Sequence, residues 1–99
     1  MLVFETYKIT SKLPSEEKFG MISQIRRASL SVLLNISEGA SRSSKIERIR
    51  FYEIARGSLI EVDTAIDIAC KLNYLQSSEL EELGSIIIEC FKIISGLIK

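Results

Sequence analysis

The sequence predicts an all-α protein, an antiparallel up-down-up-down four-helix bundle with a short first helix. Apolar residues recur at intervals of three, four and seven along four segments of the chain. The connections between these segments are short and polar, and no segment alternates apolar and polar residues as a strand would. Ninety-nine residues are enough for one hydrophobic core, so we expect a single domain over residues 1–99.

The first predicted helix runs from about Leu2 to Lys12. It should end at Leu13, because a residue that precedes a proline is disfavoured in the α conformation. Four of its side chains are expected to be buried: Val3, Phe4, Tyr7 and Ile9. This helix is much shorter than its neighbours, so either a partner covers the rest of the bundle beside it or the helix starts upstream.

The second predicted helix begins near Ser15 or Glu16, where a serine can cap the helix and acidic residues suit its positive end. It ends at Gly39, which is expected to form a left-handed C-terminal cap. One stripe of apolar residues should face the core: Ile22, Ile25, Val32, Leu33 and Ile36. Small and polar residues between them, including Asn35, would allow another helix to approach closely.

The third predicted helix opens at Ser44, and Glu47 three residues later completes a capping box. Its expected core stripe is Ile46, Ile49, Ile54 or Ala55, Leu59, Val62, Ile66 and Ala69. Gly57 interrupts this helix at a cost of about 1 kcal/mol relative to alanine. We therefore expect another backbone to pack closely against Gly57, near Ala28 or Ser31.

The fourth predicted helix follows a turn at residues 73–77 and starts with a second capping box, from Ser78 to Glu81. Its apolar residues cover nearly the whole circumference, whereas a surface helix of a monomer needs a stripe of only about 100°. Because excess apolar surface is usually covered by another chain, the sequence predicts a homo-oligomer. The alternative is a central helix buried within a single bundle.

Composition excludes several classes of function. The chain has no histidine, and its two cysteines, Cys70 and Cys90, lie apart, so we expect no cofactor, no metal site and no histidine-containing catalytic triad. The carboxylates Glu61, Asp63 and Asp67 fit a solvated acidic face better than a metal site. The serines lack a catalytic base, and we expect no enzyme activity. No signal pattern or membrane-spanning segment is visible, which favours a cytoplasmic protein with reduced thiols.

The charge is distributed unevenly, although the net charge is zero. Residues 1–56 hold ten basic and six acidic residues, whereas residues 57–99 hold three and seven. A basic cluster lies on both sides of the second interhelical connection: Arg26, Arg27, Arg42, Lys45, Arg48, Arg50 and Arg56. Such a cluster could bind phosphates, or it could be a solvated face balanced by Glu38, Glu47 and Glu53. The aromatic residues look scattered, which favours core or rim positions over a stacking platform for single strands.

Several stretches resemble one protein family over nearly the whole chain. They are Gln24-Ile25-Arg26-Arg27-Ala28-Ser29, Asn35-Ile36-Ser37-Glu38-Gly39 with Arg42, and Phe51, Ala55-Arg56-Gly57-Ser58-Leu59 and Glu61. Leu13-Pro14 followed by Glu17 and Gly20 resembles the first turn of the same family. These stretches are similar to the four-helix-bundle proteins encoded in intervening sequences of bacterial 23S rRNA genes. That family is in turn similar to the accessory variability proteins of diversity-generating retroelements.

The resemblance implies a closed homo-oligomer, a pentamer, without catalytic activity and with structured RNA or a reverse-transcriptase-like protein as its partner. Together with the basic cluster, it predicts an RNA-binding or nucleoprotein-binding rim whose phosphate contacts come from Arg26, Arg27, Arg42, Lys45, Arg48 and Arg50. The alternative hypothesis is a protein-interaction scaffold that binds no nucleic acid.

Overall fold

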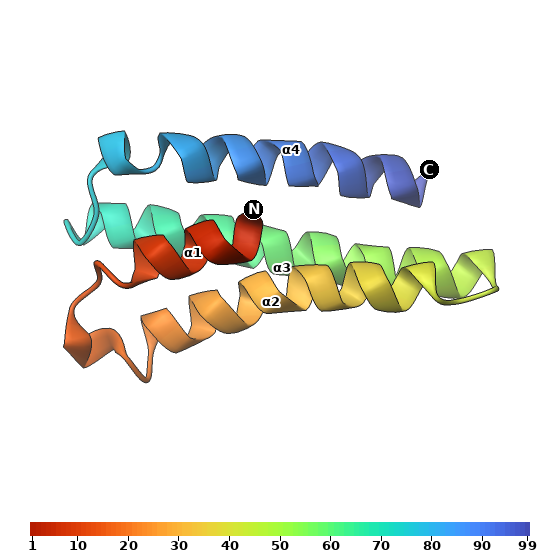
Figure 1. Ribbon diagram of the computed structural model, residues 1–99, viewed down its shortest axis with the longest axis horizontal. Helices are drawn as coiled ribbons and strands as arrows, with labels where there is room; N and C mark the ends of the chain where they lie inside the picture. Colours follow the sequence, from red (N-terminus) through yellow and green to blue (C-terminus); the bar gives the residue numbers. More distant parts are fainter.

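Four α-helices account for most of the chain in the computed structural model, which describes residues 1–99. They are α1 (Leu2–Thr10), α2 (Met21–Ala40), α3 (Lys45–Lys71) and α4 (Glu81–Ile98), with short 3₁₀ turns η1 (Ser15–Glu17) and η2 (Ser77–Glu79). Successive helices run in opposite directions along a body of 44 × 25 × 19 Å (Figure 1). The predicted all-α up-down-up-down bundle with a short first helix is thus confirmed.

The hairpin of α2 and α3 forms the centre of the molecule. These two helices make the most extensive contact, α1 packs against α2 and α4, and α4 packs against α3. The core stripe of α3 follows the predicted three- and four-residue spacing: Tyr52, Ala55, Leu59, Val62, Ile66 and Ala69. Ile46, which was expected in this stripe, is 82% exposed. Figure 1 shows why, since the first turns of α3 project beyond the end of α4.

The buried face of α1 differs from the prediction. Leu2, Thr6, Ile9 and Thr10 are buried, whereas Phe4 is 73% exposed and Tyr7 is 41% exposed. Leu2, Thr6, Ile9 and Leu13 recur at intervals of four, three and four, which places all of them toward the core. The expected burial of Phe4 and Tyr7 was wrong because the buried face of this short helix includes threonines.

The start of α2 also differs from the prediction. Residues 15–17 form the separate turn η1, and α2 starts only at Met21, so Ser15 does not cap it. At Gly20 the backbone leaves the helical conformation, with φ −111° and ψ −103°. The Glu17 carboxylate accepts a bond from the Met21 amide at 3.4 Å, which partly replaces the missing cap.

The capping box predicted at the start of α3 is present in part, and the one predicted for α4 lies elsewhere. Ser44 caps α3 by accepting a hydrogen bond from the Glu47 amide at 3.4 Å. Before α4 the box forms two residues earlier than expected, since the Glu79 carboxylate accepts a bond from the Gln76 amide at 2.9 Å within η2. The chain reverses just upstream at Asn73, whose φ of 64° lies in the left-handed region that asparagine tolerates.

The two glycines singled out in the sequence have roles other than those predicted. Gly39 lies within the last turn of α2, and no glycine has a positive φ, so the expected left-handed cap is wrong. A Cβ at Gly39 would instead lie 2.7 Å from Cε1 of Tyr52, so this glycine permits the close approach of α2 to α3. A Cβ at Gly57 would meet nothing within 4 Å, so the expected close packing there is wrong.

Helix α4 buries one line of residues and leaves apolar side chains exposed on both sides of it. Leu83, Ile87 and Ile94 are buried. The exposed apolar residues are Ile88, Phe91, Ile93 and Leu97, at 59%, 41%, 55% and 43% exposure. The alternative of a central helix buried within one bundle is therefore wrong for this protomer. None of the helices combines the length and the apolar character needed to cross a membrane.

Candidate nucleic-acid interface

The six predicted phosphate-binding residues fall into two groups. Arg26 and Arg27 lie in the first half of α2, whereas Arg42, Lys45, Arg48 and Arg50 surround the turn between α2 and α3. Sixteen residues of mostly helical chain separate Arg26 from Arg42, which corresponds to about 24 Å at the rise of an α-helix. The structure therefore brings four of the six residues together and leaves Arg26 and Arg27 on another part of the surface.

Arg26 is half-buried and joins α2 to α1. Its Nε donates a hydrogen bond to Oγ1 of Thr10 at 2.8 Å, and one of its terminal nitrogens donates to the carbonyl of Tyr7 at 3.3 Å. Its guanidinium lies 4.5 Å from the centre of the Tyr7 ring. These contacts give Arg26 a fixed position, so its first role is to hold α1 against α2.

Arg27 points outward and is 63% exposed at its side chain. It donates to Oε1 of Gln24 at 2.9 Å and to the carboxylate of Glu61 on α3 at 3.2 Å. Exposed pairs of this kind contribute little to stability, about 0–1 kcal/mol, so a phosphate could replace Glu61 at small cost.

Around the turn between α2 and α3, two of the four cations have partners within the protein. Arg42 forms an ion pair with Glu38 at 2.7 Å and lies 5.0 Å from the centre of the Phe51 ring. Arg48 donates to the backbone carbonyls of Ser43 at 2.8 Å and of Arg42 at 3.1 Å. Arg48 thus stabilises the turn itself, because its guanidinium N–H donors satisfy two backbone carbonyls there.

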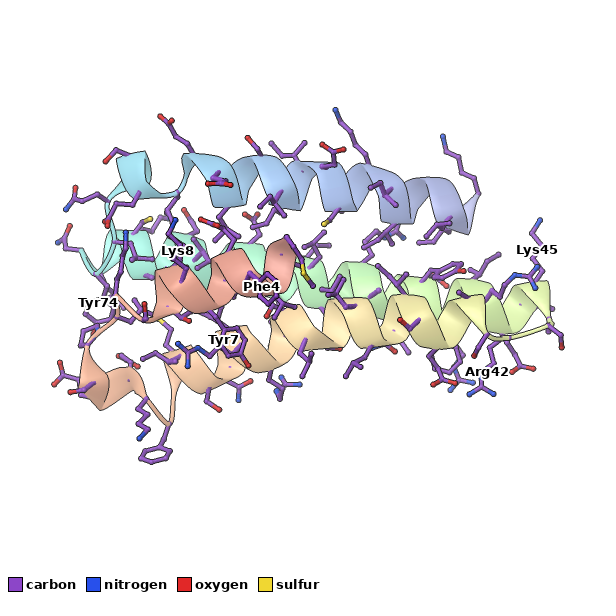
Figure 2. The ribbon with its side chains drawn as sticks, in the orientation of Figure 1. Phe4, Tyr7, Lys8, Arg42, Lys45 and Tyr74 are labelled. Atoms are coloured by element: carbon purple, nitrogen blue, oxygen red, sulfur yellow. The ribbon has the colours of Figure 1, made fainter.

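Lys45 and Arg50 are the cations of this turn that remain free. Both are exposed, and neither forms an ion pair or a side-chain hydrogen bond. Figure 2 shows the side chains of Arg42 and Lys45 at the same end of the bundle, on opposite sides of the hairpin. The end therefore presents two uncompensated positive charges next to the amide groups at the start of α3, where anions are favoured.

Sequence reasoning missed the exposed aromatic pair on α1. Phe4 and Tyr7 lie about one helical turn apart, and Tyr7 lies close to Arg26, whereas the sequence pattern had assigned both rings to the core. The four- and three-residue spacing of Leu2, Thr6 and Ile9 would have revealed this exposure if threonine had been counted among the residues that a core accepts.

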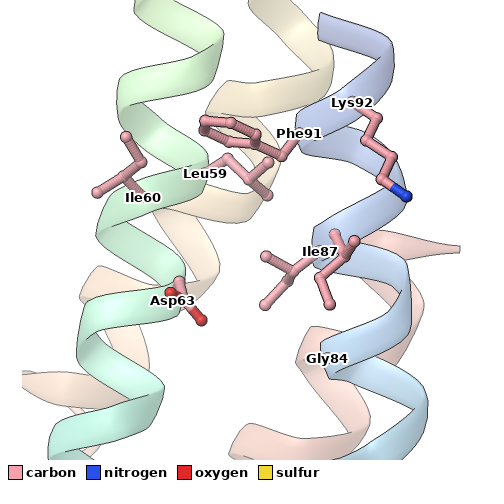
Figure 3. Close-up of a pocket in the computed structure, with 8 residues that line it drawn as sticks. Leu59, Ile60, Asp63, Gly84, Ile87, Phe91 and Lys92 are labelled. Carbon is pink, nitrogen blue, oxygen red and sulfur yellow. The ribbon is translucent and has the colours of Figure 1, made fainter. Parts of the chain in front are cut away.

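An apolar groove of about 490 Å³ lies between α3 and α4 (Figure 3). Leu59 from α3 faces Ile87 and Phe91 from α4 across it, whereas Ile60 lines the edge of the groove with its side chain directed away from α4. Ile60 is 50% exposed, so the apolar walls are open to solvent. The walls also carry charges of opposite sign, Asp63 on α3 and Lys92 on α4, and the two are not paired with each other.

The two cysteines are free and half-buried. Burial raises the pKa of the Cys90 thiol, and the neighbouring Glu89 carboxylate raises it further. Burial also raises the pKa of Cys70, with a smaller effect from the Asp67 and Glu79 carboxylates. Since the thiolate is the nucleophile, both cysteines are poorly reactive at neutral pH.

Comparison with known proteins gives one family. The family model described as "23S rRNA-intervening sequence protein" matches residues 1–96. No curated protein matches the chain.

Proposed function

Because the chain belongs to the 23S rRNA-intervening sequence protein family, we propose that it is a non-enzymatic, homo-oligomeric four-helix bundle that binds structured RNA in the bacterial cytoplasm. The observation that carries the RNA-binding part is the pair of free cations, Lys45 and Arg50, at the turn between α2 and α3. Arg42 adds a third positive charge there, held by two exposed ion pairs, with Glu38 at 2.7 Å and with Glu47 at 3.8 Å, for which a phosphate can compete.

The arrangement favours contacts to phosphates rather than to bases. Lys45 and Arg50 are long, exposed and unpaired, whereas Arg48 between them is already used by the backbone carbonyls of the turn. Contacts of this type fix position without selecting sequence and weaken steeply with salt. The target would therefore be recognised by its shape.

Self-association would repeat this charged end around an oligomer. The open groove between α3 and α4 supports a homo-oligomer, because its apolar walls and its unpaired Asp63 and Lys92 could be covered by another copy. Repeating two free cations in each copy would build the extended positive surface that an RNA needs, although the protomer has no net charge.

The test is fluorescence anisotropy of a labelled RNA hairpin with purified protein at low and moderate salt. The Lys45→Glu/Arg50→Glu variant should lose at least tenfold in RNA affinity at low salt. The slope of the logarithm of its affinity against the logarithm of the salt concentration should decrease by the amount that about two phosphate contacts contribute. A matched control, Lys18→Glu/Lys71→Glu, makes the same change of charge at the opposite end of the bundle and should bind like the wild type.

Two results would contradict the assignment of these residues. One is unchanged affinity in the Lys45→Glu/Arg50→Glu variant, and the other is an equal loss in the control. If the wild-type protein ignores RNA at low salt while light scattering shows an intact assembly, the alternative of a protein-interaction scaffold, with partners such as a reverse-transcriptase-like protein, replaces RNA binding.

A further inference from the structure

Two aromatic rings are exposed where α1 lies against α2. Phe4 is 73% exposed and Tyr7 is 41% exposed, and their three-residue spacing places them one above the other on the same side of α1. In Figure 2 both rings lie on the outer side of α1, with Tyr7 directed toward α2. Leu30, which follows Arg26 by one turn on α2 and is 44% exposed, adds apolar surface to the same side of α2 as Arg26. We call Phe4, Tyr7, Arg26 and Leu30 the aromatic face.

Arg26 gives the aromatic face a planar cation in a fixed place. The bonds to Thr10 at 2.8 Å and to the Tyr7 carbonyl at 3.3 Å hold its guanidinium 4.5 Å from the Tyr7 ring centre. Guanidinium planes and aromatic rings are the groups on which proteins stack unpaired bases. Because the protein's own hydrogen bonds already hold Arg26, binding there requires little further ordering of its side chain.

The elements that carry the aromatic face also carry exposed cations, Lys8 on α1 and Arg27 on α2, although Arg27 is paired with Glu61 of α3, whose side chain is 48% exposed. The side chains of Lys8 and Arg27 are 64% and 63% exposed, whereas the carboxylate-bearing side chain of Glu5 is only 13% exposed. Lys8 forms only a long ion pair with Glu5, at 3.9 Å, and its exposed ammonium group remains accessible to a phosphate. Positive charge beside exposed rings favours a polyanion over a neutral or acidic protein surface.

We propose that the aromatic face binds unpaired nucleotides of an RNA, with bases stacked on Phe4 and Tyr7 and phosphates next to Lys8 and Arg27. This inference rests on the proposed function and deepens it, because it makes the target an RNA that combines a paired and an unpaired segment. The paired segment would lie at the α2–α3 turn. The distance of about 24 Å along α2 corresponds to about seven nucleotides at a rise of 3.4 Å.

The test compares an RNA hairpin with the same hairpin carrying about eight unpaired adenosines, a length within the site sizes of single-strand-binding proteins. The wild-type protein should bind the tailed hairpin about tenfold more tightly. The Phe4→Leu/Tyr7→Leu variant should lose this advantage and bind the blunt hairpin as the wild type does. Both positions are exposed, so leucine leaves the core intact. Phe19→Leu, at a ring that is 90% exposed elsewhere on the surface, is the matched control.

A second measurement reports on stacking directly. The chain has no tryptophan, so Phe4→Trp introduces a single tryptophan as a fluorescent reporter at the aromatic face. Its emission should be quenched by the tailed hairpin and not by the blunt one.

The possible outcomes separate this inference from the proposed function. Equal affinity for both hairpins, with no quenching, would overturn the inference and leave RNA binding in place. If neither hairpin binds at low salt, both the inference and the proposed RNA binding are wrong. If Phe4→Leu/Tyr7→Leu changes the mass of the assembly, the face is a contact between copies and the inference is wrong.

Discussion

At Gly39 the helices α2 and α3 come too close for a side chain. A Cβ there would lie 2.7 Å from Cε1 and 3.0 Å from Cδ1 of Tyr52, and the buried Tyr52 ring cannot move aside without disturbing the core. Gly57 is the opposite case, because it faces open space on α3 and only lowers the stability of its helix. Two helical glycines of one chain thus differ in what they do for the fold.

Alanine substitutions at these two glycines should change stability in opposite directions. Gly39→Ala should lower the free energy of unfolding by about 1–3 kcal/mol through overpacking. Gly57→Ala should raise it by about 0.5–1 kcal/mol through helix propensity and a less flexible unfolded chain. Urea denaturation followed by circular dichroism measures both, and changes of the same sign would refute this account.

No local pattern distinguishes these glycines, and the same limit applies to the exposed rings. Both glycines lie within helices and directly follow a charged residue, Glu38 or Arg56. Which of them faces a neighbour depends on how far apart two helices pack, and this distance is a tertiary property. The close packing expected at Gly57 followed from the cost of a glycine within a helix, whereas the structure leaves room for a Cβ there.

At the scale of elements, an ion pair connects the end of α1 to the turn η2. Nζ of Lys12 donates to the Glu79 carboxylate at 2.9 Å. This bond lowers the pKa of Glu79 below its ordinary value of 4.5, and the Gln76 amide lowers it further. A second link at this end runs from the Tyr74 hydroxyl to the Glu17 carboxylate at 3.1 Å, and it raises the pKa of Tyr74.

The lowered pKa of Glu79 makes part of the stability dependent on pH. A carboxylate with a lowered pKa stabilises the fold above its unfolded pKa, and this contribution disappears as the pH falls through the folded pKa. The free energy of unfolding should therefore fall between about pH 6 and pH 3, and it should fall less in Lys12→Met. Urea titrations of the wild type and of Lys12→Met at the upper and lower ends of this pH range check this. Lys18→Met, which removes a lysine that forms no ion pair, is the control. An identical fall in Lys12→Met and the wild type would count against the link.

The helices were predictable from the sequence where buried residues recur every three or four positions along them. The stripe from Ala55 to Ala69 follows a regular spacing, and the structure confirms it. The helix starts were less predictable, because Ser15 and Ser78 can cap a helix and the chain uses them in 3₁₀ turns instead. In such short stretches, the bond that forms depends on groups brought in from elsewhere, as Glu17 shows through its contact with Tyr74.

For the molecule as a whole, the open groove between α3 and α4 bears on assembly. Ile60 and Ile88 project from its two walls and are 50% and 59% exposed. If the groove is covered by another copy, Ile60→Glu/Ile88→Glu should dissociate the assembly to the 11.1 kDa protomer while keeping its helical circular dichroism spectrum. Leu72→Glu, at an equally exposed leucine outside the groove, should leave the mass unchanged.

Light scattering with size-exclusion chromatography measures the mass of each variant. A wild-type protein that is already a protomer would refute self-association. An assembly that survives the double substitution would place the contact elsewhere on the surface.

The candidate site was only partly predictable, because closeness in sequence does not ensure closeness in space. Lys45 and Arg50 both lie in the first two turns of α3 and do share one end of the bundle. Arg26 belongs to the same run of basic residues, yet it lies about 24 Å away and serves α1. The sequence also could not show which cations are neutralised, because the contact between Arg27 and Glu61 joins residues 34 positions apart.

The short first helix has a mechanical consequence. In Figure 1, α1 begins about midway along the hairpin of α2 and α3, and α4 stops before the turn. The last turns of α2 and the first turns of α3 therefore pack only against each other and extend beyond the four-helix part of the bundle. A force on the turn next to Lys45 is transmitted to the rest of the bundle only through the α2–α3 interface. In that interface Gly39 packs against Tyr52, and the hydroxyls of Ser31 and Ser58 are hydrogen-bonded at 2.9 Å. The rigidity of the α2–α3 interface therefore determines how far the hairpin end can bend relative to the rest of the bundle.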